Sequence, residues 1–237
     1  MPLVWLNRAL ALHARGRGCE SPRVHSNNIS WGDGMEKWEK IADKKSIDKT
    51  ITALKNNNID AEFVKNGETA KKRVLEMIPK GAEVMVMTSM TTESIGLAQE
   101  IDNSGKYESA RKKLYSMDKN TQGAEMRRLG AAPQFVVGSV HAVTEDGQVI
   151  IASASGSQLP AYVYAAEKVI WVVGAQKLVK NVEDGIKRIY EYTLPLEDAR
   201  ARKAYGIGSG VNKLLIFNKE MKPGRVTLII ISEKLGF

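Results

Sequence analysis

Cysteine is almost absent from this sequence. Its 237 residues include a single cysteine, Cys19. One thiol cannot form an internal disulfide, and without a Cys-x-x-Cys pair the chain has no thiolate site of its own for zinc or an iron–sulfur cluster. We therefore expect a reducing, cytoplasmic setting and no cofactor bound by a cysteine motif.

Histidine and long apolar runs are also scarce. Beyond residue 34 the one histidine is His141, so no second histidine or cysteine is present there to complete a metal site. No apolar run reaches the roughly 18 residues that a membrane-spanning helix needs. Apolar residues make up 43% and charged residues 26% of the chain, which is the composition of an ordinary folded domain. We expect no membrane span and no bound metal.

Acidic residues are outnumbered by basic ones. The chain has 35 Lys and Arg against 27 Asp and Glu, a net charge of +8. This excess favours anionic partners. The basic clusters at 71–73, 112–113 and 127–128 lie on predicted helices without interleaved aromatic residues, which is typical of solvated helix faces. The sequence therefore favours a small anionic ligand over a nucleic acid.

Lysine is missing from residues 1–34, although the rest of the chain is rich in it. Asn7 and Arg8 interrupt the apolar stretch 3–12, and no clean cleavage site follows, so the segment is a poor secretory signal. We interpret residues 1–34 as a disordered or extraneous N-terminal extension before a start at Met35. The alternative is a short amphipathic helix followed by a disordered stretch. Residues 35–237 then form one domain, whose N-terminal helical part covers about 35–58.

Strands and helices alternate from Met35 onward. The apolar runs 82–87 and 169–173 are typical of strands that are covered on both faces. Periodic apolar positions predict one helix over 36–54, another from 67 to 78, and a long, highly charged one over 108–129. Together these patterns predict an α/β fold, a three-layer Rossmann-like domain with a mainly parallel sheet.

Turn and cap residues mark the later elements. Asp146-Gly147 predicts a tight hairpin turn because glycine accepts a positive φ. Asn181 is expected to cap a helix, Pro195 to end that helix and open another, and Gly206 to stop the second in a left-handed conformation. Two strands are predicted to close the chain around the turn Pro223-Gly224, at 213–217 and 226–231.

Ligands of open α/β sheets bind at the carboxyl ends of strands, where loops expose main-chain N–H groups. Segment 88–96 has this position, directly after a buried strand. We select Ser89 and Thr91 as ligand-binding residues and Glu93 as a catalytic carboxylate able to attack a thioester. The alternative is that a hydroxyl caps the following helix and Glu93 complements its dipole.

Two further segments suit an anion. Segment 153–158 is small and rich in hydroxyls, so its main chain can approach a phosphate or carboxylate closely. Segment 206–213 has three alternating glycines followed by a lysine, in a spacing that is neither a Walker loop nor a dinucleotide fingerprint. The alternatives are an ordinary turn and a mobile connection. The ligand-binding residues selected here are Ser153, Ser155, Gly156, Ser157, Gln158, Gly208, Asn212 and Lys213.

His141 is a candidate for proton transfer. The ordinary pKa of an imidazole is close to neutral, and Glu145 or Asp146 lies near enough in sequence to orient it. We select His141 as a second catalytic residue beside Glu93. The alternative is a histidine that forms a structural hydrogen bond.

Several motifs occur in one order along the chain: Ser89-Met90-Thr91 with Glu93 and Ile95-Gly96, Gly138–Gly147, Ala152–Gln158, Val169–Lys177, Val211–Ile216 and Gly224-Arg225-Val226. Together they resemble the LUD-domain family, which includes the subunit-C-type proteins of bacterial lactate utilization. The resemblance covers about residues 60–237. It implies a fold like that of sugar-phosphate isomerases (NagB/RpiA), coenzyme A transferases and formyltetrahydrofolate cyclo-ligases.

The resemblance also implies a role in oxidising L-lactate to pyruvate with partner proteins, one of which carries iron–sulfur clusters. Our leading hypothesis is a protein that binds a small organic anion in lactate or related organic-acid metabolism, within a complex. The alternatives are a non-catalytic assembly subunit and a transferase or isomerase suggested by fold analogy alone. Whether the chain is an enzyme stays open at this point.

Overall fold

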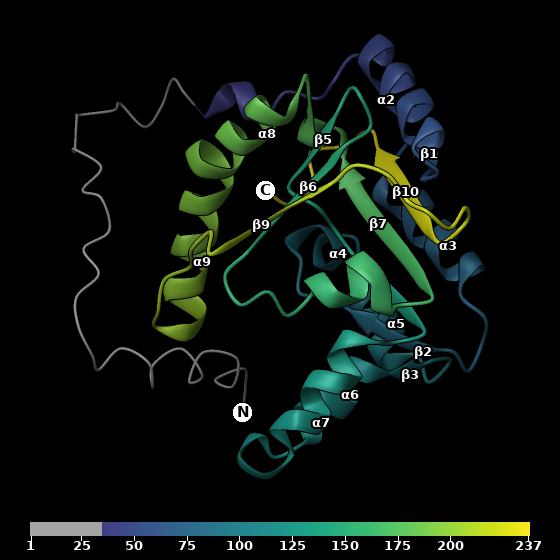
Figure 1. Ribbon diagram of the computed structural model, residues 1–237, viewed down its shortest axis with the longest axis vertical. Coiled ribbons are helices and arrows are strands. Elements are labelled where there is room, and N and C mark those ends of the chain that lie inside the picture. Colours follow the sequence, from purple (N-terminus) through teal and green to yellow (C-terminus); the bar gives the residue numbers. More distant parts are fainter. Residues whose placement is uncertain (1–34) are drawn as a thin grey trace.

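The computed structural model describes residues 35–237 (Figure 1). Our interpretation of residues 1–34 lies outside this range. The α-helices of the described part are α2 (Lys44–Asn56), α3 (Gly67–Met77), α4 (Met90–Ser94), α5 (Leu97–Asn103), α6 (Ala110–Ser116), α7 (Lys119–Ala131), α8 (Val182–Arg188) and α9 (Leu194–Tyr205). The 3-10 and π-helical turns are η1 (Glu36–Trp38), η2 (Ala161–Ala165), η3 (Ala175–Lys177) and η4 (Ile189–Thr193).

A six-stranded sheet forms the centre of the fold. Its spatial order is β1-β10-β7-β4-β2-β3, and every pair of neighbouring strands is parallel. The strands are β1 (Asp60–Val64), β2 (Glu83–Val86), β3 (Glu108–Ser109), β4 (Phe135–Gly138), β7 (Lys168–Gly174) and β10 (Val226–Ile231). The predicted α/β class with a mainly parallel sheet is confirmed.

Both faces of the sheet are buried, as the apolar runs require. Along β7, Ile170 and Val172 pack with α3 and α5 on one face, whereas Trp171 and Val173 pack with α2 on the other. This alternation follows from the opposite directions of successive side chains in a strand. In Figure 1 the helices lie on either side of β7 and β10. The predicted three layers are present around the main sheet.

A second sheet lies on the α2 side of the first, and the sequence analysis did not foresee it. Its order is β8-β5-β6-β9, with β5 (Ala142–Thr144), β6 (Val149–Ser153), β8 (Leu178–Val179) and β9 (Lys213–Phe217). Trp171 of the main sheet joins the two through edge-to-face contacts, with ring centroids 5.5 Å from Tyr162 and 5.4 Å from Phe217. The outer face of the second sheet packs against α8 and η4 in a separate apolar cluster.

Two long helices predicted from periodicity are each divided in the structure. The helix predicted over 36–54 becomes η1 and α2, because Asp43 is extended and its side chain accepts a hydrogen bond from the Ser46 N–H. The helix predicted over 108–129 becomes α6 and α7, because Asp118 caps a new start by accepting from the Asn120 N–H. Aspartate competes with the helix main chain in this way, and a periodicity count ignores it.

The predicted break at Pro195 is wrong, although the neighbouring caps are confirmed. Helical structure continues from 182 to 205 through α8, η4 and α9. Pro195 sits in the first turn of α9, where its missing N–H costs little. Asn181 caps α8 by accepting from the Asp184 N–H, and Gly206 ends α9 with φ +75°.

Both turns predicted near strands are present, and at Pro223-Gly224 the glycine takes φ +75°. Gly147 takes φ +78° in the hairpin between β5 and β6, as predicted. Strands 213–217 and 226–231 do form, but as β9 and β10 they belong to different sheets and do not pair with each other.

Within residues 35–237 no helix is long and apolar enough to cross a membrane.

Candidate functional site

Three loops meet at the carboxyl ends of neighbouring strands. In the sheet order β7-β4-β2, the chain leaves β2 into α4, β4 into residues 139–141, and β7 into η3. Because parallel strands all end at the same edge, their following residues converge there. This is the place where the sequence analysis expected a ligand.

Lys177 is a buried amine at this edge. Its side chain is 2% exposed. The Nζ atom lies 3.1 Å from Thr91 Oγ1, 3.3 Å from Ser139 Oγ and 3.1 Å from the carbonyl oxygen of Val140. Burial, followed by the charge of Arg188, lowers its pKa well below the ordinary value of lysine. The environment therefore favours the neutral amine.

Arg188 is a second buried basic side chain, next to the same loop. It donates through Nη1 to the carbonyl oxygen of His141 at 2.7 Å and to Thr193 Oγ1 at 3.1 Å. Its Nε and Nη2 atoms are buried and have no hydrogen-bond partner. Burial lowers the pKa of Arg188 to about 10, so the guanidinium stays charged at neutral pH. Nε and Nη2 form the edge of a guanidinium that pairs with both oxygens of a carboxylate.

His141 adjoins both of these side chains. Its carbonyl oxygen accepts from Arg188, and the residue before it, Val140, accepts from Lys177. Its Nδ1 atom accepts a hydrogen bond from the Ala152 N–H at 3.1 Å. Burial, with the charges of Lys177 and Arg188, lowers the pKa of His141 to about 3, so the ring is neutral at neutral pH. A neutral ring that accepts at Nδ1 carries its proton on Nε2. His141 therefore offers a hydrogen-bond donor at Nε2 and is a poor general base.

We refer to Lys177, Arg188 and His141 as the cation cluster. Among residues 35–237, neither Lys177 nor Arg188 forms an ion pair, whereas the buried Arg225 pairs with Glu220 at 2.7 Å. A buried cation without a counter-charge is costly, and an anionic ligand removes that cost. Ser139 and His141 are partly exposed, so the cluster borders solvent along residues 139–141.

Segment 88–96 contributes one of its three selected residues to the cluster. Thr91 is fully buried and contacts Lys177 as described. Ser89 caps α4 by accepting from the Thr91 N–H at 3.2 Å. Glu93 is exposed on α4 and lines a separate hollow of about 360 Å³, together with the ion pair between Asp102 and Arg111. Its catalytic role stays a prediction.

Segment 153–158 is joined to the cation cluster through His141, since Ala152 immediately precedes it. Within the segment, Ser153 Oγ donates to Gln158 Oε1 at 2.9 Å and accepts from the Gly156 N–H at 2.8 Å. Gly156 takes φ +83°. The hydroxyls of Ser155 and Ser157 lie 3.0 Å apart on the exposed side. These contacts order the loop; ligand binding by its residues stays a prediction.

Segment 206–213 is divided between two places. Asn212 Nδ2 donates to the carbonyl oxygen of Ala154 at 3.2 Å, and Lys213 pairs with Ser153 across the second sheet. The structure therefore brings these two residues to segment 153–158. Gly208 instead packs against Asp198 of α9, which accepts from the N–H of the next residue, Ser209, at 2.8 Å.

The chain's last residues lie over the Lys177 neighbourhood. Thr91 Oγ1 donates to the carbonyl oxygen of Leu235 at 3.1 Å. Gln176 Nε2 donates to the same oxygen at 3.0 Å and to that of Gly236 at 3.3 Å. Gly236 has φ +63°, and a Cβ there would collide with Thr91. Residues 235–236 thus close one side of the cluster.

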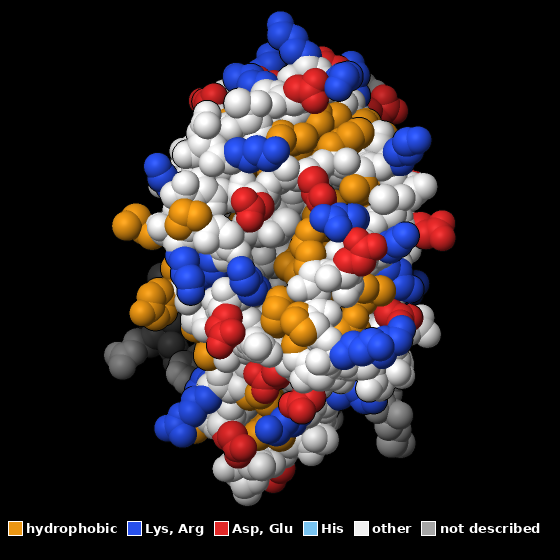
Figure 2. Space-filling model, turned by 90° about the vertical axis from the view of Figure 1, so that its right-hand side faces the viewer, with side chains coloured by type: hydrophobic (Ala, Val, Ile, Leu, Met, Phe, Trp, Pro, Cys, Tyr) orange, Lys and Arg blue, Asp and Glu red, His pale blue; other side chains and the backbone are white. Residues whose placement is uncertain are grey.

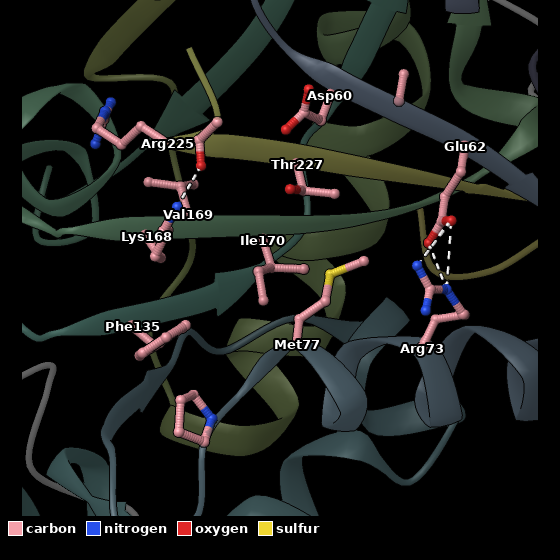
Figure 3. Close-up of a pocket in the computed structure, with 13 residues that line it drawn as sticks. Asp60, Glu62, Arg73, Met77, Phe135, Lys168, Val169, Ile170, Arg225 and Thr227 are labelled. Atoms are coloured by element: carbon pink, nitrogen blue, oxygen red, sulfur yellow. Dashed lines mark hydrogen bonds and ion pairs between the residues drawn. The ribbon is translucent and has the colours of Figure 1, made fainter. Parts of the chain in front are cut away.

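A larger cavity lies at the opposite edge of the main sheet (Figure 3). It measures about 590 Å³ and is lined by the first residues of β1, β4 and β7, which are Asp60, Phe135 and Lys168. Its Arg73 pairs with Glu62 at 3.1 Å, as Figure 3 shows. Ligands of parallel sheets bind at the carboxyl ends. We therefore place the functional site at the cation cluster, where buried donors lack partners.

Basic side chains form no continuous patch on the face shown in Figure 2. Lys and Arg side chains there are interspersed with Asp and Glu. Elsewhere in the described residues, too, opposite charges lie next to each other, as in the ion pairs of Arg73 with Glu76 at 2.8 Å and of Lys106 with Glu100 at 3.0 Å. A duplex-binding surface needs a continuous basic patch, and this face offers none.

Sequence reasoning missed two members of the cluster. Lys177 ends one of the motifs that carry the family resemblance but has no predicted role, and Arg188 is not among the predicted site residues. Each carries a signal nonetheless. Lys177 follows the end of β7, whose residues 169–173 are all apolar, by three residues, and Arg188 adjoins the buried Ile189. A charged residue on a buried face is a candidate for function.

The fold is that of an α/β protein, and the cation cluster lies at the carboxyl end of its parallel sheet. The chain belongs to the LUD-domain family, whose model matches residues 47–231. A DUF162 family protein from Deinococcus radiodurans is similar in structure, with a TM-score of 0.52 and 11% identity over 81% of this chain and 100% of that one. Ribose 5-phosphate isomerase from Plasmodium falciparum gives a TM-score of 0.34 and 12% identity over 72% of this chain and 94% of that one. A comparison with curated protein sequences gave no match.

Proposed function

We propose that this LUD-domain protein binds a small organic acid at the cation cluster and serves lactate or related organic-acid metabolism in the cytoplasm. The association of its family with lactate utilization supports the metabolic setting. The observation that carries the binding proposal is the buried guanidinium of Arg188, whose Nε and Nη2 atoms have no partner. An organic carboxylate has the charge and the paired oxygens that this edge accepts.

The other members of the cluster suit the rest of such a ligand. Lactate and pyruvate each have an oxygen on the carbon next to the carboxylate. His141 can donate from Nε2 to that oxygen, and Ser139 is a second polar group on the partly exposed side. The proposed ligand is therefore a 2-hydroxy or 2-oxo acid, held by one cation and two neutral polar groups.

Oxidation of L-lactate to pyruvate releases a pair of electrons that must be passed on. The chain has one cysteine, which cannot ligate a cluster alone. We infer that the electrons pass to an iron–sulfur partner protein within a complex. Support for this step comes from the family's association with lactate utilization and not from a contact in the structure.

Calorimetric titration tests the binding proposal. The ligands are L-lactate, pyruvate, inorganic phosphate and coenzyme A, and the variants are Arg188→Lys and Arg200→Lys. Arg188→Lys keeps the charge but removes the paired donors, so organic-acid affinity should fall by about tenfold or more. Arg200 already pairs with Glu197 at 2.7 Å, and its variant should bind normally.

Two results would count against the proposal. One is no heat of binding with any of the four ligands, which would favour the assembly-subunit alternative. The other is equal affinity in the wild type and in Arg188→Lys. Thermal unfolding of both variants is measured alongside, and Lys177→Met provides a second change in the cluster if Arg188→Lys does not fold.

A further inference from the structure

Lys177 has the surroundings of a nucleophilic amine. Lysine becomes a nucleophile in proteins when it is desolvated or placed beside another cation. Lys177 is 2% exposed, and Arg188 lies close enough for its charge to lower the lysine pKa. Among the described residues no carboxylate pairs with Lys177 to hold its proton.

We propose that Lys177 forms a reversible imine with the ketone carbon of a 2-oxo acid. The proposal rests on the proposed function, because the anion site supplies the hold on the substrate's carboxylate. A 2-oxo acid fits because its ketone is bonded directly to its carboxylate. In the proposed complex the guanidinium edge of Arg188, where Nε and Nη2 have no partner, takes the carboxylate, and the Lys177 amine attacks the adjacent carbon.

The contacts of Nζ include one group able to exchange a proton on the partly exposed side. The carbonyl oxygen of Val140 has no proton, and the Thr91 hydroxyl proton goes to the carbonyl oxygen of Leu235 at 3.1 Å. The hydroxyl of Ser139 accepts from Nζ at 3.3 Å, and its own proton has two long contacts, to Thr91 Oγ1 at 3.3 Å and to the carbonyl oxygen of Val140 at 3.5 Å. Ser139 is therefore placed to exchange a proton with the reacting nitrogen.

The step balances without an oxidant or reductant. The nitrogen lone pair attacks the ketone carbon and forms the C–N bond, and the ketone oxygen takes a proton. The resulting carbinolamine breaks its C–O bond and releases water, and the nitrogen loses its protons as the C=N bond forms. Amine and ketone thus give imine and water, and the reverse reaction is hydrolysis. The partly exposed residues 139–141 mark the side from which water and ligand arrive.

Borohydride trapping tests the proposal. The full-length protein is incubated with pyruvate and sodium cyanoborohydride, digested, and mapped by tandem mass spectrometry. We expect one reduced pyruvate adduct on Lys177. The exposed Lys180 is the matched control: Lys180→Met should keep the adduct and Lys177→Met should lose it. Acetone, which has the ketone without the carboxylate, should label Lys177 far less.

Ser139→Ala separates chemistry from fold. It should slow trapping by about tenfold or more at saturating pyruvate, and the loss of pyruvate affinity, measured by calorimetry, should be smaller than the loss of trapping rate, since Ser139 is also a polar group of the proposed binding site. If pyruvate binds in an Arg188-dependent way but the adducts are absent or spread over surface lysines, the imine is overturned and the proposed function stands. If neither binding nor adduct is found, both fail. Mapping the wild-type protein decides the matter even if Lys177→Met does not fold.

Discussion

The Nζ atom of Lys177 lies 3.1 Å from the carbonyl oxygen of Val140, and no carboxylate within residues 35–237 pairs with it. A lysine in that position lowers the stability of the empty protein, because its charged form is desolvated without a counter-charge. We predict that Lys177→Met raises the free energy of unfolding by about 1 kcal/mol in urea denaturation at neutral pH. Lys180→Met, at an exposed position, should stay within about 0.5 kcal/mol of the wild type.

Acid should destabilise the fold partly through His141. The folded-state pKa of about 3 lies below the ordinary imidazole value of 6.5, so between these values the unfolded chain binds a proton that the native ring does not. The contribution of His141 is present above about pH 6.5 and is lost as the pH falls towards 3, by up to about 1.4 kcal/mol per pH unit.

The variant for this test is His141→Asn, whose side-chain oxygen can accept from the Ala152 N–H in place of Nδ1. Denaturant unfolding is measured from about pH 7 to about pH 5, above the range where most carboxylates titrate. The wild type should lose stability across this window, and the variant should show a flatter profile. Equal slopes would mean that His141 is protonated in the native state.

The buried ion pair of Glu220 and Arg225 should support the turn η2. Arg225 also donates to the carbonyl oxygens of Tyr162 at 2.7 Å and Ala166 at 3.1 Å. Glu220→Gln leaves the guanidinium buried without its counter-charge, so we predict a loss of about 3 kcal/mol. Asp48→Asn, in an exposed pair with Lys44, should cost about 0.5 kcal/mol or less. Comparable losses in the two variants would refute the distinction.

Gly138 should tolerate no side chain. It is the last residue of β4, and an added Cβ would collide with the hydroxyl of Tyr162. That hydroxyl also accepts from the Ser139 N–H. We predict that Gly138→Ala lowers the free energy of unfolding by about 2 kcal/mol and weakens pyruvate binding by displacing Ser139.

Gly123 is the control for this substitution. It lies within α7, and an added Cβ would meet its nearest neighbour, Arg127, at an ordinary 3.7 Å. Gly123→Ala should therefore stabilise the protein by about 1 kcal/mol, since alanine is the better helix former. Thermal and denaturant unfolding of the two variants would show opposite signs. A stable Gly138→Ala protein would mean that Tyr162 moves without cost.

The sheet could be predicted because its strands are buried on both faces. Runs such as 82–87 and 169–173 then read as nearly unbroken apolar sequence, and they became β2 and β7. The second sheet escaped because β8 has two residues and β5 three, too few to show alternation. Helix breaks at Asp43 and Asp118 escaped because periodicity does not register a cap.

The position of the candidate site in the fold could be predicted from the sequence better than the residues that form the site. The rule on strand ends led to Thr91, which does contact the cation cluster. It did not lead to Lys177 or Arg188, since a sequence does not show which charged side chains tertiary packing removes from water. Nor does it show which ring nitrogen of His141 is engaged by the main chain, and that contact decides what the imidazole can do.

The pairing of β1 with β10 has a consequence for how the protein is made. β1 is an edge strand whose one neighbour in the sheet is β10, and Asp60 stands beside Thr227. A ribosome therefore needs on the order of ten seconds between releasing the one strand and releasing the other. Throughout that interval β1 lacks β10, its partner in the native sheet, and must avoid pairing with other strands. The main sheet is complete only after β10 is synthesised, and by then the ribosome has already made Thr91, His141, Lys177 and Arg188.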